Sequence, residues 1–292
     1  MAVKVLLDTD IGSDINDAIC LAYLLAQPAC ELLGITTVTG EAEQRAMLAS
    51  VLCKAAGKAV PIFPGQQEPL SVRPRQTTVP QARVLPHWAH DTTFPEKQAV
   101  NFLRQTIHDN PGQITLLTTG PLTNVALLFA VEPEIPALLR QVVMMAGRYT
   151  ADLPEPASLE WNVWCDPYAF AKVLTSATPL RAVGIGITSR VQLDTAVVLD
   201  RFWAPPLRPV LDFGEGWFQE REHITFHDAV AAATIYDDQV CAFQRGTITV
   251  ELDSEPLRGL TRWQADDAGP HEIAVAVDVD RFLAHFFTVL EG

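Results

Sequence analysis

Four aspartates and one asparagine occur within ten residues near the N-terminus, in the segment Asp8-Thr-Asp10-Ile-Gly-Ser-Asp14-Ile-Asn16-Asp17. Like charges this close together raise one another's pKa, which costs stability. A hard cation removes that repulsion, and a set of oxygen ligands selects calcium or magnesium over zinc. Capping the helix that follows would need only one or two acids. We therefore interpret the segment as a metal-binding site.

Two later segments carry possible ligands but have simpler explanations when taken alone. Thr119 lies in Leu117-Thr-Thr-Gly-Pro-Leu-Thr-Asn124, which would expose backbone carbonyls, yet the segment is also an ordinary strand-to-helix turn. His227 and Asp228 precede the apolar helix expected over 229–235, where Asp228 would serve as its N-cap. The pair gains a functional meaning only if the fold brings it to the acidic cluster.

The elements that must position these residues alternate between strand and helix. The sequence predicts strands over 3–7, 32–38, 60–63, 114–118 and 142–145, and helices over 17–26, 41–57, 96–110 and 122–130. Such alternation indicates a single α/β domain over residues 1–292, with a mostly parallel central sheet flanked by helices. Ligands of open α/β sheets bind outside the carboxyl ends of the strands. The proline-rich stretch 64–95 is long enough to be functional.

Composition excludes several classes of function. The 21 Lys+Arg against 35 Asp+Glu give a net charge of −14, and the chain has no basic patch of the kind that nucleic-acid binding requires. Five scattered cysteines without CxxC spacing indicate reduced thiols. No apolar stretch approaches a membrane span of ~20 residues, and no signal peptide precedes the first strand. We expect a cytoplasmic protein with a small-molecule ligand and neither a nucleic-acid nor a membrane partner.

Five motifs, in order along the chain, resemble those of the nucleoside hydrolase family, in particular the inosine-uridine preferring nucleoside N-ribohydrolases. The aspartate signature running from Asp8 to Ala18 is the first. The others are Thr119-Gly-Pro-Leu-Thr-Asn124, Met145-Ala-Gly147, Glu160-Trp-Asn162 with Asp166-Pro167, and His227-Asp228-Ala229. Each motif is weak singly, but the ordered set is specific. The resemblance implies the Rossmann-like architecture of that family and hydrolysis of the bond between base and ribose.

The resemblance also implies a calcium site. In this family Ca²⁺ lies at the floor of the pocket and binds both the nucleophilic water and the ribose diol. Carried over to this chain, Asp10, Asp17 and Asp228 would ligate the ion through carboxylates, and Thr119 through its carbonyl. Asp10 would also be the general base, which is coherent because the metal lowers the pKa of a water that this carboxylate already touches.

The remaining implied roles concern the nucleoside substrate. Glu160 and Asn162 resemble residues that bind ribose hydroxyls, and Met145 is expected to contact the substrate. His227 resembles the histidine that protonates the leaving base in base-unspecific and pyrimidine-preferring members, and His90 is matched with another pocket histidine. The transition state is expected to be a ribosyl oxocarbenium ion. Family members are usually dimers or tetramers, which implies a homodimer or homotetramer here.

The chain departs from the family pattern at two substrate positions. The usual signature has two adjacent aspartates before the alanine, and here the first is Asn16, which can offer a neutral hydrogen bond to ribose but not a charge-assisted one. The segment is also two residues longer than the compact version, so Asp14 is a candidate for part of that role. Glu41 stands where many members have Asn. These departures leave the base preference open.

Two other functions compete with this interpretation. Aspartyl-phosphate phosphatases also have a strand ending in Asp-x-Asp, but they need a lysine to neutralise the phosphoryl group. The lysines here mostly lie within or beside the predicted elements, at Lys4, Lys54, Lys58, Lys97 and Lys172. A catalytically altered nucleoside- or ribose-binding paralogue is the second alternative, because fold does not fix function. Release of ribose with and without a chelator separates the three.

Overall fold

Strand β1 (Val3–Thr9) is an interior strand of the sheet and is buried from Val5 onward. It pairs in parallel with β2 (Cys30–Thr37) on one side and β4 (Ile114–Thr118) on the other. Its side chains alternate between two cores, because Val5 and Leu7 pack on one face and Leu6 on the opposite face. A strand covered on both faces has to be apolar throughout. The computed structural model describes residues 2–149 and 159–291.

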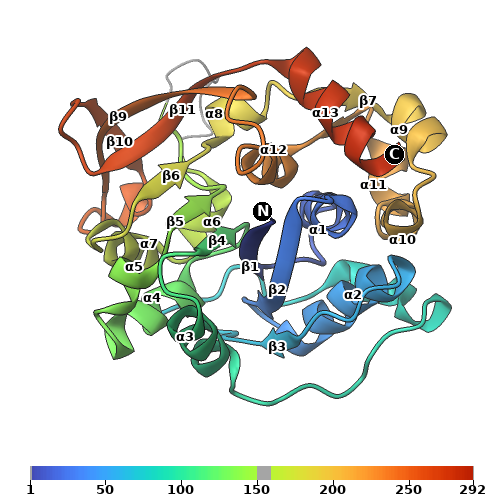
Figure 1. Ribbon diagram of the computed structural model, residues 1–292, viewed down its shortest axis with the longest axis horizontal. Coiled ribbons are helices and arrows are strands. Elements are labelled where there is room, and N and C mark those ends of the chain that lie inside the picture. The colour runs from blue at the N-terminus through green and yellow to red at the C-terminus, as the bar shows by residue number, and fades with distance from the viewer. Residues whose placement is uncertain (1, 150–158, 292) are drawn as a thin grey trace.

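The main sheet has nine strands in the order β10-β9-β11-β6-β5-β4-β1-β2-β3 (Figure 1). Its other members are β3 (Ile62–Pro64), β5 (Gln141–Met144), β6 (Leu180–Ala182), β9 (Cys241–Val250), β10 (Thr261–Ala265) and β11 (His271–Val277). The run from β3 to β11 is parallel, while β9 is antiparallel to both β11 and β10. A separate two-stranded sheet joins β7 (Gln192–Asp194) to β8 (His223–Thr225). The predicted single α/β domain with a mostly parallel sheet is confirmed.

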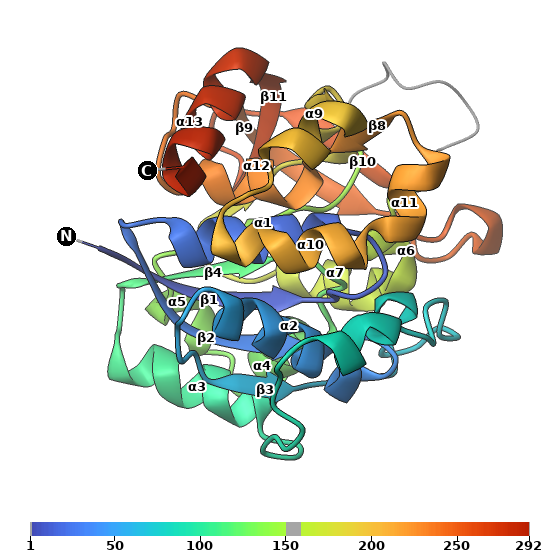
Figure 2. The ribbon, with the colours of Figure 1, turned by 90° about the vertical axis from the view of Figure 1, so that its right-hand side faces the viewer.

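Helices cover both faces of the sheet (Figures 1 and 2). One face carries α1 (Asn16–Ala26), α2 (Ala42–Ala55), α10 (Arg208–Phe213), α12 (His227–Ala233) and α13 (Val279–Glu291). The other carries α3 (Ala99–Asp109), α4 (Thr123–Val131), α5 (Ile135–Leu138) and α7 (Pro167–Leu174). The connections contain α6 (Trp161–Cys165), α8 (Ile185–Thr188), α9 (Thr195–Arg201), α11 (Glu215–Glu220) and the 3-10 helices η1 (Pro80–His87), η2 (Pro205–Leu207) and η3 (Glu255–Leu257).

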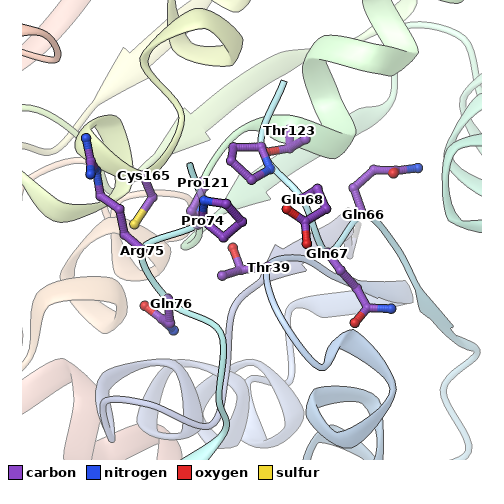
Figure 3. Close-up of a pocket in the computed structure, with 11 residues that line it drawn as sticks. Thr39, Gln66, Gln67, Glu68, Pro74, Arg75, Gln76, Pro121, Thr123 and Cys165 are labelled. Carbon is purple, nitrogen blue, oxygen red and sulfur yellow. The ribbon is translucent and has the colours of Figure 1, made fainter. Parts of the chain in front are cut away.

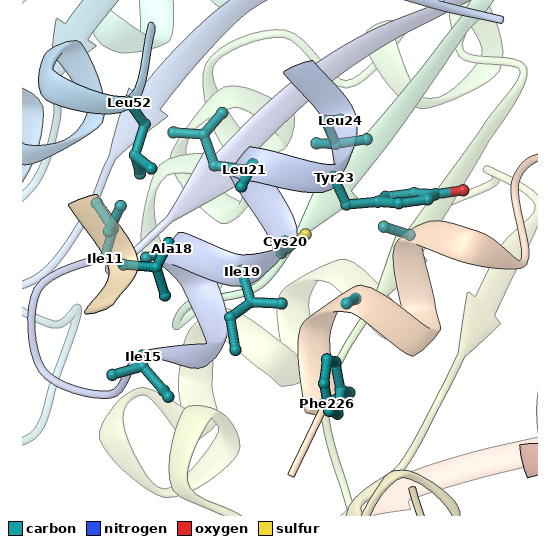
Figure 4. Packing of buried hydrophobic residues seen from close by; sticks show 14 of the residues in the cluster. Ile11, Ile15, Ala18, Ile19, Cys20, Leu21, Tyr23, Leu24, Leu52 and Phe226 are labelled. Atoms are coloured by element: carbon teal, nitrogen blue, oxygen red, sulfur yellow. The ribbon is translucent and has the colours of Figure 1, made fainter. Parts of the chain in front are cut away.

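Helix α1 is buried on nearly all sides, as Figure 4 shows. Its apolar side chains pack against Leu52 of α2 and Phe226, which precedes α12. A helix that is apolar all round belongs inside a core. Because Asn16 and Asp17 form the first turn of this helix, the core itself fixes the position of two polar residues at the carboxyl end of β1.

Element boundaries differ from the predicted ones where the backbone leaves the helical region. The helix expected over 41–57 begins at Ala42, because Glu41 has a φ of 58°. The helix expected over 96–110 begins at Ala99, after Lys97 with a φ of 56°. The helix expected over 229–235 begins earlier, at His227, so Asp228 lies in its first turn and is not its N-cap. No helix of the described ranges 2–149 and 159–291 is long and apolar enough to cross a membrane.

Candidate active site

A pocket of about 480 Å³ opens at the carboxyl ends of the parallel strands. Most of the segments that line it follow β1, β4, β5 and β6 or begin α1, α6 and α12, as expected for an open α/β sheet. Its lining residues are Asp10, Ser13, Asp14, Asn16, Asp17, Gln76, Thr119, Met145, Glu160, Trp161, Asn162, Ile185, Trp217, Arg221, His227 and Asp228.

Three buried carboxylates, those of Asp10, Asp17 and Asp228, come together in this pocket from three elements. Burial raises the pKa of all three, and the charge of Asp17 raises the pKa of Asp10 and Asp228 further. Asp17 Oδ1 is held by two hydroxyls, accepting from Thr9 Oγ1 at 2.5 Å and from Thr119 Oγ1 at 2.8 Å. The fold therefore brings three carboxylates together in a buried place, where their charged forms are poorly solvated.

A fully buried cation supports the loop that carries Asp10. The guanidinium of Arg45, on α2, donates to the backbone carbonyl of Asp10, to the carbonyl of Ile11 at 3.1 Å and to the carbonyl of Gly40 at 2.9 Å. Gly12 in the same loop has a φ of 120°, and a Cβ there would lie 2.4 Å from Val79 Cγ1. The loop between β1 and α1 is thus packed against α2 and Val79.

Asp14 and Asn16, the two candidates for the ribose contact, are bonded to each other. The Asn16 amide donates to Asp14 Oδ1 at 2.6 Å, and Asn16 Oδ1 accepts from the backbone N–H of His227 at 3.3 Å. Burial raises the pKa of Asp14 to about 6. Both side chains line the pocket, and Asn16 ties the aspartate loop to the start of α12.

Glu160 and Asn162 are fixed by the turn that begins α6. Glu160 is the N-cap residue, and its carboxylate accepts from the backbone N–H groups of Asn162 at 2.8 Å and Gly147 at 3.0 Å. Asn162 donates to the carbonyls of Thr119 at 2.8 Å and Met145 at 3.0 Å. Because those carbonyls directly follow β4 and β5, the hydrogen bonds hold Glu160 and Asn162 at the ends of these two strands.

His227 enters the pocket as a neutral imidazole. Burial lowers its pKa to about 4, well below neutrality. Nδ1 lies 2.7 Å from the hydroxyl of Thr188 on α8. When Thr188 donates this hydrogen bond, the ring carries its proton on Nε2. At pH 7 the His227 side chain is therefore rarely an imidazolium. In its neutral form it can still donate one hydrogen bond.

Nearly the whole chain matches a known family. The family model of the inosine-uridine preferring nucleoside hydrolases matches residues 5–284. The chain belongs to the nucleoside hydrolase family. As such it is a ribosyl hydrolase, and the predicted enzyme class is confirmed.

Individual nucleoside hydrolases match over nearly their full length. The inosine-uridine preferring nucleoside hydrolase of Leishmania major is 30% identical over 315 residues, covering 100% of this chain and 98% of its own. Uridine nucleosidase 1 of Arabidopsis thaliana is 28% identical, with 97% and 91% covered. The solved structure of a purine-preferring ribonucleoside hydrolase from Gardnerella vaginalis gives a TM-score of 0.84 at 24% identity, with 99% and 98% covered, which shows the shared fold.

Six residues that line this nucleoside hydrolase pocket are not predicted from the sequence: Ser13, Gln76, Trp161, Ile185, Trp217 and Arg221. Trp161 could have been found, because it lies between Glu160 and Asn162. Trp217 lies within α11 and Arg221 directly follows that helix, with the guanidinium 3.8 Å from the ring centroid of the tryptophan. Nothing in the local pattern around them indicates a pocket. No lysine lines the cavity in the described part of the chain, which argues against the phosphatase alternative.

Two expected substrate residues, Glu41 and His90, do not line the pocket. The carboxylate of Glu41 turns toward the proline-rich stretch and accepts from the backbone N–H of Val79 at 2.8 Å. His90 places Nδ1 2.8 Å from the carbonyl of Trp88. Glu41 has a left-handed backbone conformation at the start of α2. Their positions give no support to a substrate contact.

The oxygen donors of the pocket suit calcium by their chemistry. Buried carboxylates that raise one another's pKa are stabilised by a cation between them. Within residues 2–149 and 159–291, however, no three His, Cys, Asp or Glu side chains form a ready-made metal site. The carboxylates of Asp17 and Asp228 would therefore have to turn toward that of Asp10 for the three to hold an ion.

Proposed function

We propose that this nucleoside hydrolase cleaves the N-glycosidic bond of ribonucleosides to free base and ribose, with Asp10 as the general base. The observation that carries the proposal is the convergence of the acid cluster, the Glu160–Asn162 pair and His227 in one pocket. Its volume of about 480 Å³ lies in the range of small-molecule sites, roughly 300–1,000 Å³. Asp10 is the carboxylate placed directly after β1, within reach of a water in this cavity.

The ribose end of the pocket is the acidic end. Asp14, Asn16, Glu160 and Asn162 offer acceptors and amide donors to sugar hydroxyls, with Met145 beside them. Fixed carboxylates also stabilise the positive charge that develops on the ribosyl oxocarbenium ion. Because backbone N–H groups already hold Glu160, this stabilisation needs little reorganisation during the reaction.

We propose that the aromatic side chains that line the pocket bind the base. Trp161 and Trp217 offer ring surfaces to a planar base, and His227 is the group that faces the leaving base in our assignment. Since the imidazole is neutral, we propose that it supports departure of the base by donating a hydrogen bond from Nε2. Glu41 and His90 are not included, because they lie outside the cavity.

We further propose Ca²⁺ as the cofactor, held by the carboxylates of Asp10, Asp17 and Asp228 and the carbonyl of Thr119. The donor chemistry supports this assignment, and so does the mutual repulsion of the acids. When bound, the ion would lower the pKa of a coordinated water and offset the charge of the carboxylates.

The preferred base is left unassigned. The matched relatives carry names that specify inosine and uridine, uridine alone, or purines. Ribonucleosides as a class are therefore the proposed substrate. We propose a cytoplasmic location from the scattered free cysteines, and a homodimer or homotetramer from the family resemblance.

The test is ribose release from inosine, uridine and cytidine by the native chain and the Asp10→Asn variant, with calcium and with a chelator. The variant keeps an oxygen at the same place but loses the proton acceptor. We expect kcat to fall ~10²–10⁴-fold, the usual contribution of a general base. A correctly folded Asp10→Asn protein with near-native kcat would show that another group is the base. Binding of nucleosides by the native chain without any release of ribose would favour the binding paralogue.

A further inference from the structure

One side chain of the proline-rich stretch 64–95, that of Gln76, donates a hydrogen bond to the carboxylate of Asp10. Gln76 Nε2 lies 3.2 Å from Asp10 Oδ2 and 2.5 Å from Ser13 Oγ, and Gln76 Oε1 accepts from Trp161 Nε1 at 2.6 Å. Both N–H groups and the carbonyl oxygen of this buried amide are thus engaged. Turning the amide over would set its NH₂ group against the indole N–H, donor against donor, so its orientation is fixed.

The backbone around Gln76 is held as firmly as its side chain. Figure 3 shows Pro74, Arg75 and Gln76 beside Pro121, Thr123 and Cys165. Arg75 Nε donates to the carbonyl of Trp164 at 3.0 Å, and the guanidinium lies 4.0 Å from the ring centroid of that tryptophan. On the other side, a Cβ on Gly40 would lie 2.6 Å from the carbonyl oxygen of Gln76. The strand ends therefore leave this segment little freedom to move.

We propose that Gln76 is a positioning residue for Asp10. Trp161, which hydrogen-bonds to Gln76, would link a bound base to the orientation of this amide. This inference rests on the proposed role of Asp10 as general base. The hydrogen bond to Oδ2 fixes the plane of the carboxylate, so that its other oxygen stays directed at the reacting water. Trp161 is 44% exposed at the pocket, so a bound base would rest on the same indole that orients the amide.

The test compares Gln76→Met with the native enzyme in the presence of calcium. Methionine keeps the length of the side chain but has neither the amide donors nor the acceptor. We expect kcat to fall roughly tenfold on inosine and on an activated p-nitrophenyl riboside alike, a part of the ~10²–10⁴-fold contribution of a general base, while KM changes less than about threefold. Gln67→Met, in the same segment but on an exposed glutamine that accepts from the Glu41 N–H outside the pocket, should leave both constants unchanged.

Two double variants show whether the loss of kcat in Gln76→Met depends on Asp10 and on Trp161. Adding Gln76→Met to Asp10→Asn should cause no further loss of kcat, because the carboxylate being positioned is already gone. Trp161→Phe keeps an aromatic ring without the N–H, so it should lower kcat in the native background but add nothing to Gln76→Met.

The outcomes separate the two proposals. A Gln76→Met protein with native kcat, or one that loses the same factor in the Asp10→Asn background, overturns the positioning role. A fall in melting temperature with equal changes in kcat and KM would show a merely structural role and overturns it as well. Native kcat in Asp10→Asn alone overturns the base assignment itself.

Discussion

At the scale of single residues, the pocket gathers ionisable groups whose usual charge states are costly there. Asp10 and Asp228 are buried beside Asp17, and burial pushes their pKa values up while it pushes that of His227 down to about 4. Shifts of this kind in a cleft are typical of functional sites. The role of each side chain can be tested by a substitution that removes its charge or its hydrogen-bonding group.

His227 offers the sharpest test, because assistance to the leaving base matters only for poor leaving groups. We expect His227→Ala to slow inosine and uridine sharply, by ~10²-fold or more, the low end of acid-base effects. A p-nitrophenyl riboside needs no proton on its leaving group and should be hydrolysed at close to the native rate. Steady-state kcat values for the three substrates provide the measurement.

The control for His227 is Asp228→Asn at the next position. That variant alters the acid cluster, so it should slow natural and activated substrates by the same factor. If His227→Ala also slows all substrates equally, the histidine supports the structure of the pocket and does not assist the leaving base.

At the scale of elements, α2 and the β1–α1 loop are held together by a buried arginine. Arg45 supplies hydrogen bonds to carbonyls on two segments that are far apart in sequence, at Asp10 and Ile11 and at Gly40. Backbone carbonyls inside a protein need partners, and each one left without a donor costs about 1–3 kcal/mol. Helix α2 thus determines the shape of a loop that it does not follow in the chain.

We expect Arg45→Met to lower the free energy of unfolding by about 3 kcal/mol or more, because a buried hydrogen-bonded cation is lost from beside acids. Urea unfolding followed by circular dichroism gives the shift in midpoint. Arg140→Met, at an exposed arginine, should change stability by no more than about 0.5 kcal/mol. A loss below 1 kcal/mol for Arg45→Met would mean that water replaces the guanidinium.

At the scale of the whole molecule, the net charge of −14 and the acidic pocket both favour a cation as a ligand of the native state. Unfolded chain has no such convergence of carboxylates, so a bound ion stabilises only the folded form. The gain is about 2.7 kcal/mol when free ligand is a hundredfold above its dissociation constant.

Calcium removal should therefore lower the melting temperature and abolish turnover together. The measurement is thermal unfolding with added CaCl₂ and with chelator, paired with ribose release in the same buffers. Asp17→Asn is the matched variant, since it removes one proposed ligand charge, and its melting temperature should respond weakly to calcium. Unchanged melting temperature and turnover of the native chain after chelation would exclude the calcium proposal.

The sequence by itself determined the alternation of strands and helices and the acidic end of β1. Strand β4 spans the predicted 114–118, because five apolar or β-branched residues between turn residues have one stable environment, a buried parallel strand. The family motifs indicated Asp10, Thr119, Glu160, Asn162 and Asp228, all of which line one pocket. Local patterns sufficed for these five residues, since each follows a strand or lies at the start of a helix at the carboxyl edge of the sheet.

Only the tertiary structure decided which loops reach the pocket at the carboxyl ends of the strands. Gln76 and Trp217 come from connections without hydrophobic periodicity, so their path depends on long-range contacts such as that of Arg75 with Trp164. Glu41 and His90 had been expected in the pocket, yet backbone conformation and local hydrogen bonds hold them outside it. The neutral state of His227 is likewise a property of burial, which depends on everything packed around the ring and not on its neighbours in the chain.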